Sequence, residues 1–525
     1  MISPVIKELV NKTRESLAKK SASEGAAKIH VDEIASRVAA FYEKVRNIID
    51  YQEEHLLRRR FVHRVFRRRM ILSLEDSIAE SIIKDTIRSG HLPNDSVPES
   101  KIQDVQKVIE NYGCLLRNLN GGNEGRREAI TEWLRKITAS AIEEELFPPI
   151  KDHMIADLMF FTLKDHLVVK GGTLTEEEIN SQLFIAVQKA LLRVDEDQLH
   201  YRLLKFVYPQ WNTVSKEECP RIAKELPAIR EKIEKLTDHP LAPMFYRLCD
   251  RYNTVFYILS DVIDEEMGYE ALEKSLSNEE QLQQDVEIAY EKRFKKEKKR
   301  LNRLAFLSVL SFFISKIAVA IAIEIPIEMR LVNGFSLINT IINIAFPPFL
   351  MFLIVTSIRM PSSENVDLVL EEVKNVVYEE RPKKYVLEIP KKKGLMGSVV
   401  RLFYFLVFII SFYYLTLLLL KLNFNAANIV IFTFFTALVA ATGVKLNNRS
   451  KEISLEEKKS TILSFLVDVF ALPLITLGKW IIRGLAKFNI LVVLINLIVE
   501  LPFQLFVEFL ESLRGFIKSK KEEIN

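Results

Sequence analysis

Lys316 is the one ionisable residue well within an apolar stretch of about twenty residues, 304–323. A lysine inside a membrane-spanning helix costs about 2.5–3.5 kcal/mol on insertion scales, so it needs a partner and indicates a functional site. The next apolar stretch offers Asn339 and Asn343, which lie one helical turn apart. An antiparallel hairpin of the two stretches would place Lys316 level with these amides. We therefore predict a hydrogen bond from Lys316 to Asn339 or Asn343.

Two kinds of chemistry fit these three residues. Their bonds can join the helices structurally, at roughly 0.6–2 kcal/mol each, or the polar groups can line a path for an ion or small solute. A channel or transporter normally needs a ring of charge, or broken helices in two related halves. The later apolar stretches contain few polar residues, and we see no inverted repeat. We favour the structural role and keep transport as the alternative.

A second group of candidate residues lies in 53–70, which is rich in arginine. Its arginines are Arg58, Arg59, Arg60, Arg64, Arg67, Arg68 and Arg69. Apolar residues between them recur at helical spacing, so we expect a basic amphipathic helix. The basic face can pair with acidic runs such as 143–145 or 261–266, lie on anionic lipid headgroups, or contact nucleic acid. We favour pairing, and the acidic balance of residues 1–300 disfavours nucleic acid.

The third group is Lys479, Arg483 and Lys487, which lie four residues apart on one helical face of the apolar region 462–517. If residues 463–478 crossed a membrane, these cations would face outward. That orientation conflicts with the usual excess of basic residues on the cytoplasmic side. Two helices in the cytoplasmic interface, or a re-entrant hairpin, avoid the conflict. We favour this arrangement over two true spans.

The sequence shows no pattern of catalytic or metal-binding residues. The eight histidines form neither HExxH nor Glu-x-x-His. The pairs at 121–122 and 171–172 are glycines without the lysine of a phosphate-binding loop. Asp152-His153 and Asp165-His166 come closest to a metal cluster, and we interpret them as ordinary surface pairs. We predict no cofactor and favour a protein that is not an enzyme.

Four stretches are long and apolar enough to span a membrane, since each approaches the roughly 20 residues that a bilayer requires. They cover about 304–323, 335–358, 400–420 and 427–444. Basic residues flank them mainly on one side, within 292–303, 359–399 and 445–459. The positive-inside rule then places both termini in the cytoplasm. We expect a multi-pass protein of the plasma membrane.

Residues 1–276 have apolar residues at helical spacing almost throughout, and we expect no sheet of any size. Thr175 with Glu178, and Ser277 with Glu280, have capping-box spacing and predict two helix starts. The second start opens a helix that no proline or glycine interrupts before residue 323. One helix can therefore leave a soluble domain and enter the bilayer. Pro347-Pro348 must bend or break the second span.

The net charge is +4 over 525 residues, and the basic excess lies beside the apolar stretches, where membrane topology explains it. The three cysteines, Cys114, Cys219 and Cys249, show no CxxC spacing and cannot all pair within one chain. We interpret them as reduced thiols of a cytoplasmic domain. The first residues lack an apolar segment, so we expect no cleavable signal peptide.

The predicted fold class is all-α, with a large N-terminal cytoplasmic helical domain joined by a long stalk helix to a multi-pass transmembrane domain. The predicted parts are the cytoplasmic helical domain (1–276), the stalk helix with a basic cluster (277–303), a transmembrane hairpin (304–358), a cytoplasmic loop with a short amphipathic helix (359–399), a second transmembrane hairpin (400–444), a cytoplasmic loop (445–461), an interfacial, re-entrant or transmembrane helix pair (462–517) and a cytoplasmic tail (518–525). We expect residues 1–276 to fold alone.

The expected partners are the lipid bilayer and a cytoplasmic protein. The favoured function is a membrane-anchored binding or scaffold protein that presents its cytoplasmic helical domain. The alternative is a small-solute or ion transport protein with a regulatory cytoplasmic domain.

Overall fold

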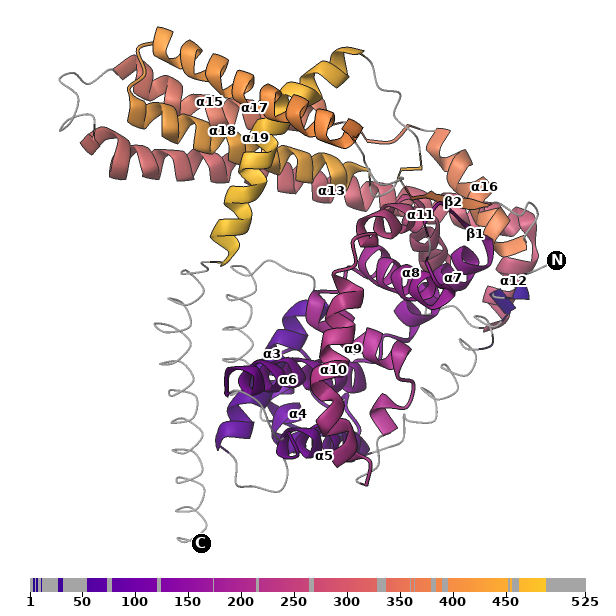
Figure 1. Ribbon diagram of the computed structural model, residues 1–525. Coiled ribbons are helices and arrows are strands. Elements are labelled where there is room, and N and C mark those ends of the chain that lie inside the picture. The colour runs from indigo at the N-terminus through magenta and orange to yellow at the C-terminus, as the bar shows by residue number, and fades with distance from the viewer. Residues whose placement is uncertain are drawn as a thin grey trace, which may run out of the picture.

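The computed structural model describes residues 54–487 with short gaps, together with a few residues nearer the N-terminus (Figure 1). The residues described before 54 are 3–4, 6–7, 11 and 27–31, and the gaps are 73–77, 120–123, 173, 214–216, 264–268, 328–336, 359, 363, 379–383, 390–394, 452–453 and 456–461. Almost all of the described chain is helical, which confirms the all-α class. Four of its helices are long and apolar enough to cross a membrane.

The N-terminal helices, α3 to α12, bury three apolar cores. They are α3 (Glu54–Leu72), α4 (Ile78–Arg88), α5 (Ser100–Arg117), α6 (Glu124–Leu146), α7 (Ile150–His166), α8 (Glu176–Leu191), α9 (Glu196–Val207), η1 (Trp211–Thr213), α10 (Cys219–Thr237), α11 (Ala242–Val262) and α12 (Tyr269–Ser277). The predicted capping box of α8 is confirmed. The Thr175 hydroxyl accepts from the Glu178 backbone N–H at 3.2 Å, and the Glu178 carboxylate accepts from the Thr175 N–H at 2.8 Å.

The core around α7, α8 and α11 includes residues from beyond position 276. Val286 of α13, Val373 of α16 (Glu364–Tyr378) and Leu387 of β2 (Tyr385–Glu388) are all buried in it. The amphipathic helix predicted within 359–399 is therefore present as α16 and packs on this core. A chain that ended at residue 276 would lack these side chains, so this core argues against the expectation that residues 1–276 fold alone.

One short parallel ladder interrupts the helices. β1 (Leu167–Lys170) pairs with β2, with Leu167 opposite Tyr385 and Lys170 opposite Glu388. We predicted no sheet of any size, and this ladder has only two strands of four residues, too short to show a sustained alternation in the sequence. Gly171 follows β1 with a φ of +81°, and a Cβ atom there would lie 2.9 Å from the Ile389 carbonyl oxygen. Glycine permits both this turn and the close approach of the two strands.

The longest helix is α13 (Glu279–Val319), which continues through the π-helical segment η2 (Ala320–Glu324) to Ile327. Its N-cap is Asn278, whose side-chain oxygen accepts from the backbone N–H groups of Glu280 and Gln281 at 3.0 and 3.3 Å. The predicted cap, Ser277, instead ends α12, so that prediction is wrong by one residue. Figure 1 shows α13 running from beside the N-terminal helices into the group of apolar helices.

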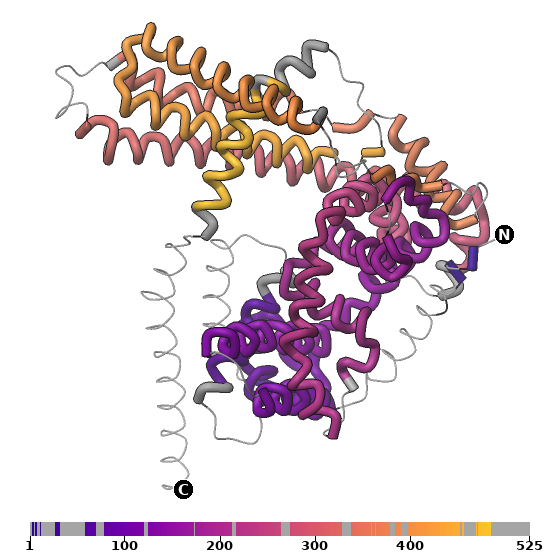
Figure 2. The backbone as a smooth tube through the Cα atoms, in the orientation of Figure 1, coloured from indigo at the N-terminus to yellow at the C-terminus, as the bar shows by residue number. Residues whose placement is uncertain are grey.

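We call residues 304–327, α15 (Leu337–Ser357), α17 (Leu395–Lys421) and α18 (Ala426–Ser450) the apolar bundle. Helices α13, α15 and α18 pack against one another, and α17 joins them mainly through α19 (Figure 2). The four are the candidate spans, close to the predicted bounds. Large apolar side chains such as Phe306 are exposed on them, as expected for surfaces that face lipid. α15 is a single helix that contains Pro347 and Pro348, where we predicted a bend or break.

The last described helix, α19 (Ile462–Lys487), packs on α18 and α17 and crosses the bundle obliquely in Figure 1. Gly478 lies so close to α18 that a Cβ atom there would collide with the Ala437 backbone. Small residues on both helices permit this approach, as is common between membrane helices. The rest of the predicted pair within 462–517, and the tail 518–525, lie outside the described residues, so their arrangement stays a prediction.

The cysteines differ from the expectation of three reduced thiols. Cys114 of α5 and Cys219 of α10 form a disulfide with their Cα atoms 6.3 Å apart, and Cys249 is a buried free thiol. The paired residues are 105 positions apart in the sequence. Helix packing brings them together, which spacing alone could not reveal.

Candidate functional site

Lys316 has a partner inside the apolar bundle, and that partner is Glu324. The Lys316 Nζ donates to the Glu324 carboxylate, and the side chains are 0% and 2% exposed. Both charged groups are therefore almost completely shielded from the exterior of the protein. Desolvation costs several kcal/mol per ion, and mutual attraction offsets this cost only where geometry and further hydrogen bonds are good.

The π-helical segment explains how two residues eight positions apart on one helix can meet. In a regular α-helix such residues lie about 12 Å apart along the axis and point to different faces. The five residues of η2 have wider turns, with hydrogen bonds from i to i+5. These turns rotate Glu324 back toward the face that carries Lys316, and the long lysine side chain covers the remaining rise. Single π-turns are frequent at functional sites.

Two neighbouring helices complete this group, which we call the Lys316 cluster: Lys316, Glu324, Asn343 and Phe435. Asn343 of α15 is fully buried and donates Nδ2–H to the second Glu324 carboxylate oxygen at 3.1 Å. The Phe435 ring of α18 has its centroid 4.8 Å from Lys316 Nζ, a cation–π distance. Asn343 Oδ1 is buried without a hydrogen-bond partner in the described part of the chain. The cluster thus joins α13, α15 and α18.

The predicted partners of Lys316 are therefore corrected. Asn343 reaches the lysine only through Glu324, and Asn339 donates to the Asn423 carbonyl oxygen at 2.8 Å, in the turn between α17 and α18. Glu324 was missed because it lies at the outer end of the apolar stretch, about 12 Å along a regular helix from Lys316, which is a long reach for the lysine side chain. The available signal was an acid eight residues beyond the only lysine of that stretch.

The arginine-rich stretch forms α3, and most of its arginines contact the N-terminal helices. Arg59 is buried and pairs with Asp195 and Asp197 at the start of α9. Further contacts are Arg58 to Glu143 at 3.6 Å, Arg58 over the Phe147 ring at 4.3 Å, and Arg68 and Arg69 to Asp85 at 3.2 and 3.0 Å. Arg60 and Arg64 are half-buried, and Arg67 is exposed. This agrees with the interpretation that the basic face pairs with acids of the same chain.

A second set of buried titratable groups lies among α6, α7 and α9. Burial raises the pKa of Glu143 to about 7, although Arg58 and Arg202 oppose that shift. Burial, together with the nearby Arg202, lowers the pKa of His153 to about 4. His153 Nε2 lies 3.7 Å from Glu144, which also accepts from Lys205. We interpreted His153 as part of a surface pair, but the structure buries most of its ring within this network.

The basic residues of α19 are only partly described. Lys479 and Arg483 are exposed, and Lys487 ends the helix with a side chain that lies outside the description. Among the residues that the structure describes, no three His, Cys, Asp or Glu side chains gather so that they could hold a metal ion. No known family, curated protein or solved structure matches this chain. The geometry alone must therefore carry a functional proposal.

Proposed function

We propose that this chain is a multi-pass membrane protein that anchors a helical domain at the cytoplasmic face of the plasma membrane, where that domain binds a cytoplasmic protein. In this proposal the apolar bundle spans the bilayer, and α13 is the stalk that joins it to the N-terminal helices. Four apolar helices with exposed apolar side chains support the insertion. The continuous helix Glu279–Ile327 supports the stalk.

We favour an anchor over a transporter because the polar groups of the Lys316 cluster are shielded from solvent. A transport path must let water or a solute reach its polar groups. Lys316, Glu324 and Asn343 are almost fully shielded, and the two charges neutralise each other. A closed and neutral cluster that joins three helices serves to hold a membrane anchor together.

A transport function remains the second candidate, because two features of the same cluster favour it. η2 is a π-helical segment of the kind found at functional sites. Asn343 Oδ1 is also a buried acceptor that lacks a partner in the described part of the chain. A transient opening at η2 would expose this oxygen and the Lys316–Glu324 pair to a solute.

Reconstitution into liposomes separates the two candidates. The anchor proposal predicts that liposomes carrying the full chain dissipate a proton or potassium gradient no faster than protein-free liposomes. The transport alternative predicts a flux that the variant Lys316→Met/Glu324→Gln abolishes while the protein stays folded. Such a flux, lost on removal of the two charges, would overturn the anchor proposal.

The orientation is tested by cysteine labelling in intact cells. Lys421 is the last residue of α17, Ser362 follows the C-terminal end of α15, and both are exposed. The basic flanks predict that a membrane-impermeant maleimide labels Lys421→Cys and not Ser362→Cys, against the wild-type chain as background. The reverse pattern would place the N-terminal helices outside the cell, where a disulfide such as Cys114–Cys219 is usual.

A further inference from the structure

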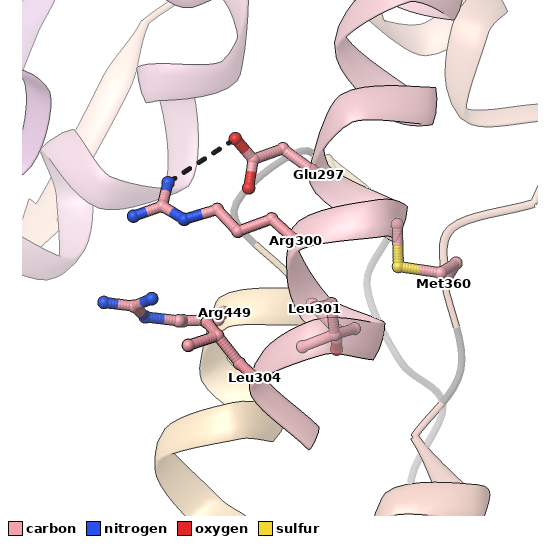
Figure 3. Close-up of a pocket in the computed structure, with 7 residues that line it drawn as sticks. Glu297, Arg300, Leu301, Leu304, Met360 and Arg449 are labelled. Carbon is pink, nitrogen blue, oxygen red and sulfur yellow. Dashed lines mark ion pairs between the residues drawn. The ribbon is translucent and has the colours of Figure 1, made fainter. Parts of the chain in front are cut away.

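A shallow hollow opens where α13, the segment after α15, and the end of α18 meet (Figure 3). It is lined by Glu297, Arg300, Leu301, Leu304, Met360, Arg449 and Ser450. Its cavity volume is about 10 Å³, room for about one water molecule or one phosphate oxygen. A larger group would therefore rest on the hollow and place a single atom inside it.

The charged residues that line this hollow are two arginines and one glutamate. Arg300 pairs with Glu297 on the same helix at 3.7 Å, and both side chains are half-buried. Arg449 reaches the hollow from α18, and Figure 3 shows its guanidinium group pointing to the same side as that of Arg300. In the described part of the chain, no carboxylate lies within ion-pair distance of Arg449. Arg449 thus brings a guanidinium group to the hollow beside the Arg300–Glu297 pair, an arrangement that suits an anion.

The other side of the hollow is apolar and continues into the bundle. Leu301 and Leu304 pack with Met351 of α15 and Leu446 of α18. The hollow thus lies at the level where the polar part of α13 gives way to its apolar part. If the bundle spans a bilayer, this level is that of the lipid phosphates, and an amphiphile would find cations beside an apolar wall.

We propose that this hollow binds the phosphate of an anionic phospholipid, with Arg300 and Arg449 as hydrogen-bond donors and the leucines and Met360 beside the glycerol and upper acyl chain. Arginine suits this role because its planar guanidinium can donate two parallel hydrogen bonds to a phosphate. The apolar wall favours a lipid over free phosphate. This inference rests on the proposed membrane insertion of the bundle.

Native mass spectrometry of the full chain in detergent tests this site. Added phosphatidylglycerol should bind more tightly than phosphatidylcholine to the wild-type protein. Arg300→Gln or Arg449→Gln should weaken phosphatidylglycerol binding several-fold, and both together at least tenfold. Arg449→Lys keeps the charge without the paired donors and should give an intermediate loss. Lys299→Gln, an exposed cation on the same helix, is the matched control and should leave binding unchanged.

Several results would overturn the proposal. These are equal binding of the two lipids, unchanged binding by the double variant, or a loss with Lys299→Gln as large as with Arg449→Gln. Competition by millimolar inorganic phosphate alone would assign the site to a soluble phosphate. Each variant must give the wild-type circular dichroism spectrum and insert into liposomes like the wild type. A wild-type chain that failed to insert would contradict the proposed membrane anchor, whereas normal insertion with unaltered lipid binding by the variants would contradict only this site.

Discussion

Two buried cations, Arg59 among the N-terminal helices and Lys316 in the apolar bundle, are compensated in different ways. The Arg59 side chain is 3% exposed, but its partners Asp195 and Asp197 are 26% and 25% exposed, so water solvates the far side of the pair. Lys316 and Glu324 are 0% and 2% exposed. Their remaining compensation comes from Asn343 and Phe435.

The two regions therefore tolerate a buried charge by different means. Asp197 also lies 3.4 Å from Lys136, so the partners of Arg59 keep a cation and water if the arginine is lost. Burial raises the pKa of Asp197, but Arg59 and Lys136 outweigh this effect and hold the pKa below its usual value. Among the described contacts, Glu324 has neither a second cation nor comparable access to water. A single change in the Lys316 cluster should therefore destabilise the protein more than one at Arg59.

The largest expected effect comes from Glu324→Gln. This change leaves the Lys316 cation buried without its counter-charge, which costs about 3–5 kcal/mol when a buried pair loses one partner. Thermal unfolding of the full chain in detergent should show a clearly lower midpoint than wild type. The exposed Glu388→Gln is the control and should stay near wild type. An unchanged midpoint for Glu324→Gln would mean that the pair is not sealed as described.

The next effect depends on pH and belongs to the N-terminal helices. The pKa of Glu143 is raised from 4.5 to about 7, so the folded state keeps its proton where the unfolded state has lost it. Its stabilising contribution is present below pH 4.5 and is lost as pH rises through 7, a change of about 3 kcal/mol. We compare the free energy of unfolding of Glu143→Gln with that of wild type at each pH. The difference should favour the variant more at pH 7 than at pH 4.5.

For His153 we predict a pH dependence of stability opposite in sign to that of Glu143. Its pKa is lowered from 6.5 to about 4, so its contribution is present above pH 6.5 and is lost as pH falls through 4. The difference in free energy of unfolding between His153→Gln and wild type should therefore favour the variant more at pH 4 than at pH 7. Shifts of the same sign for Glu143→Gln and His153→Gln would show that global charge, and not these buried groups, sets the pH dependence.

The smallest effect is expected at Arg59. Arg59→Met removes charge-assisted hydrogen bonds but leaves aspartates that reach water, so we expect a loss of about 2 kcal/mol. Arg67→Met, on the same helix but exposed, should change stability by less than about 0.5 kcal/mol. A larger loss for Arg59→Met than for Glu324→Gln would reverse the comparison between the two regions.

The sequence predicted the parts of the fold that depend on local pattern. The four apolar helices and the amphipathic helix α16 follow from hydropathy and periodicity over a single stretch. Lys316 was recognised because a cation in an apolar stretch needs a partner. These features require no knowledge of which segments meet in space.

The remaining features depend on contacts that local pattern does not encode. A π-helical segment changes which residues share a face, so a period of 3.6 could not place Glu324 beside Lys316. Arg59 meets Asp195, and Cys114 meets Cys219, only through packing of helices distant in sequence. For the same reason, the apolar core that includes Val373 contains residues from both sides of the predicted domain boundary at residue 276.

A double-mutant cycle on Lys316 and Glu324 tests the central claim, that this pair is a sealed structural element of the proposed membrane anchor. Unfolding of the full chain in detergent is measured for wild type, Lys316→Met, Glu324→Gln and the double variant. We predict that each single change is strongly destabilising and that the double variant recovers to within about 1 kcal/mol of wild type, because it removes both charges together. A double variant whose loss equals the sum of the two single losses would contradict the account.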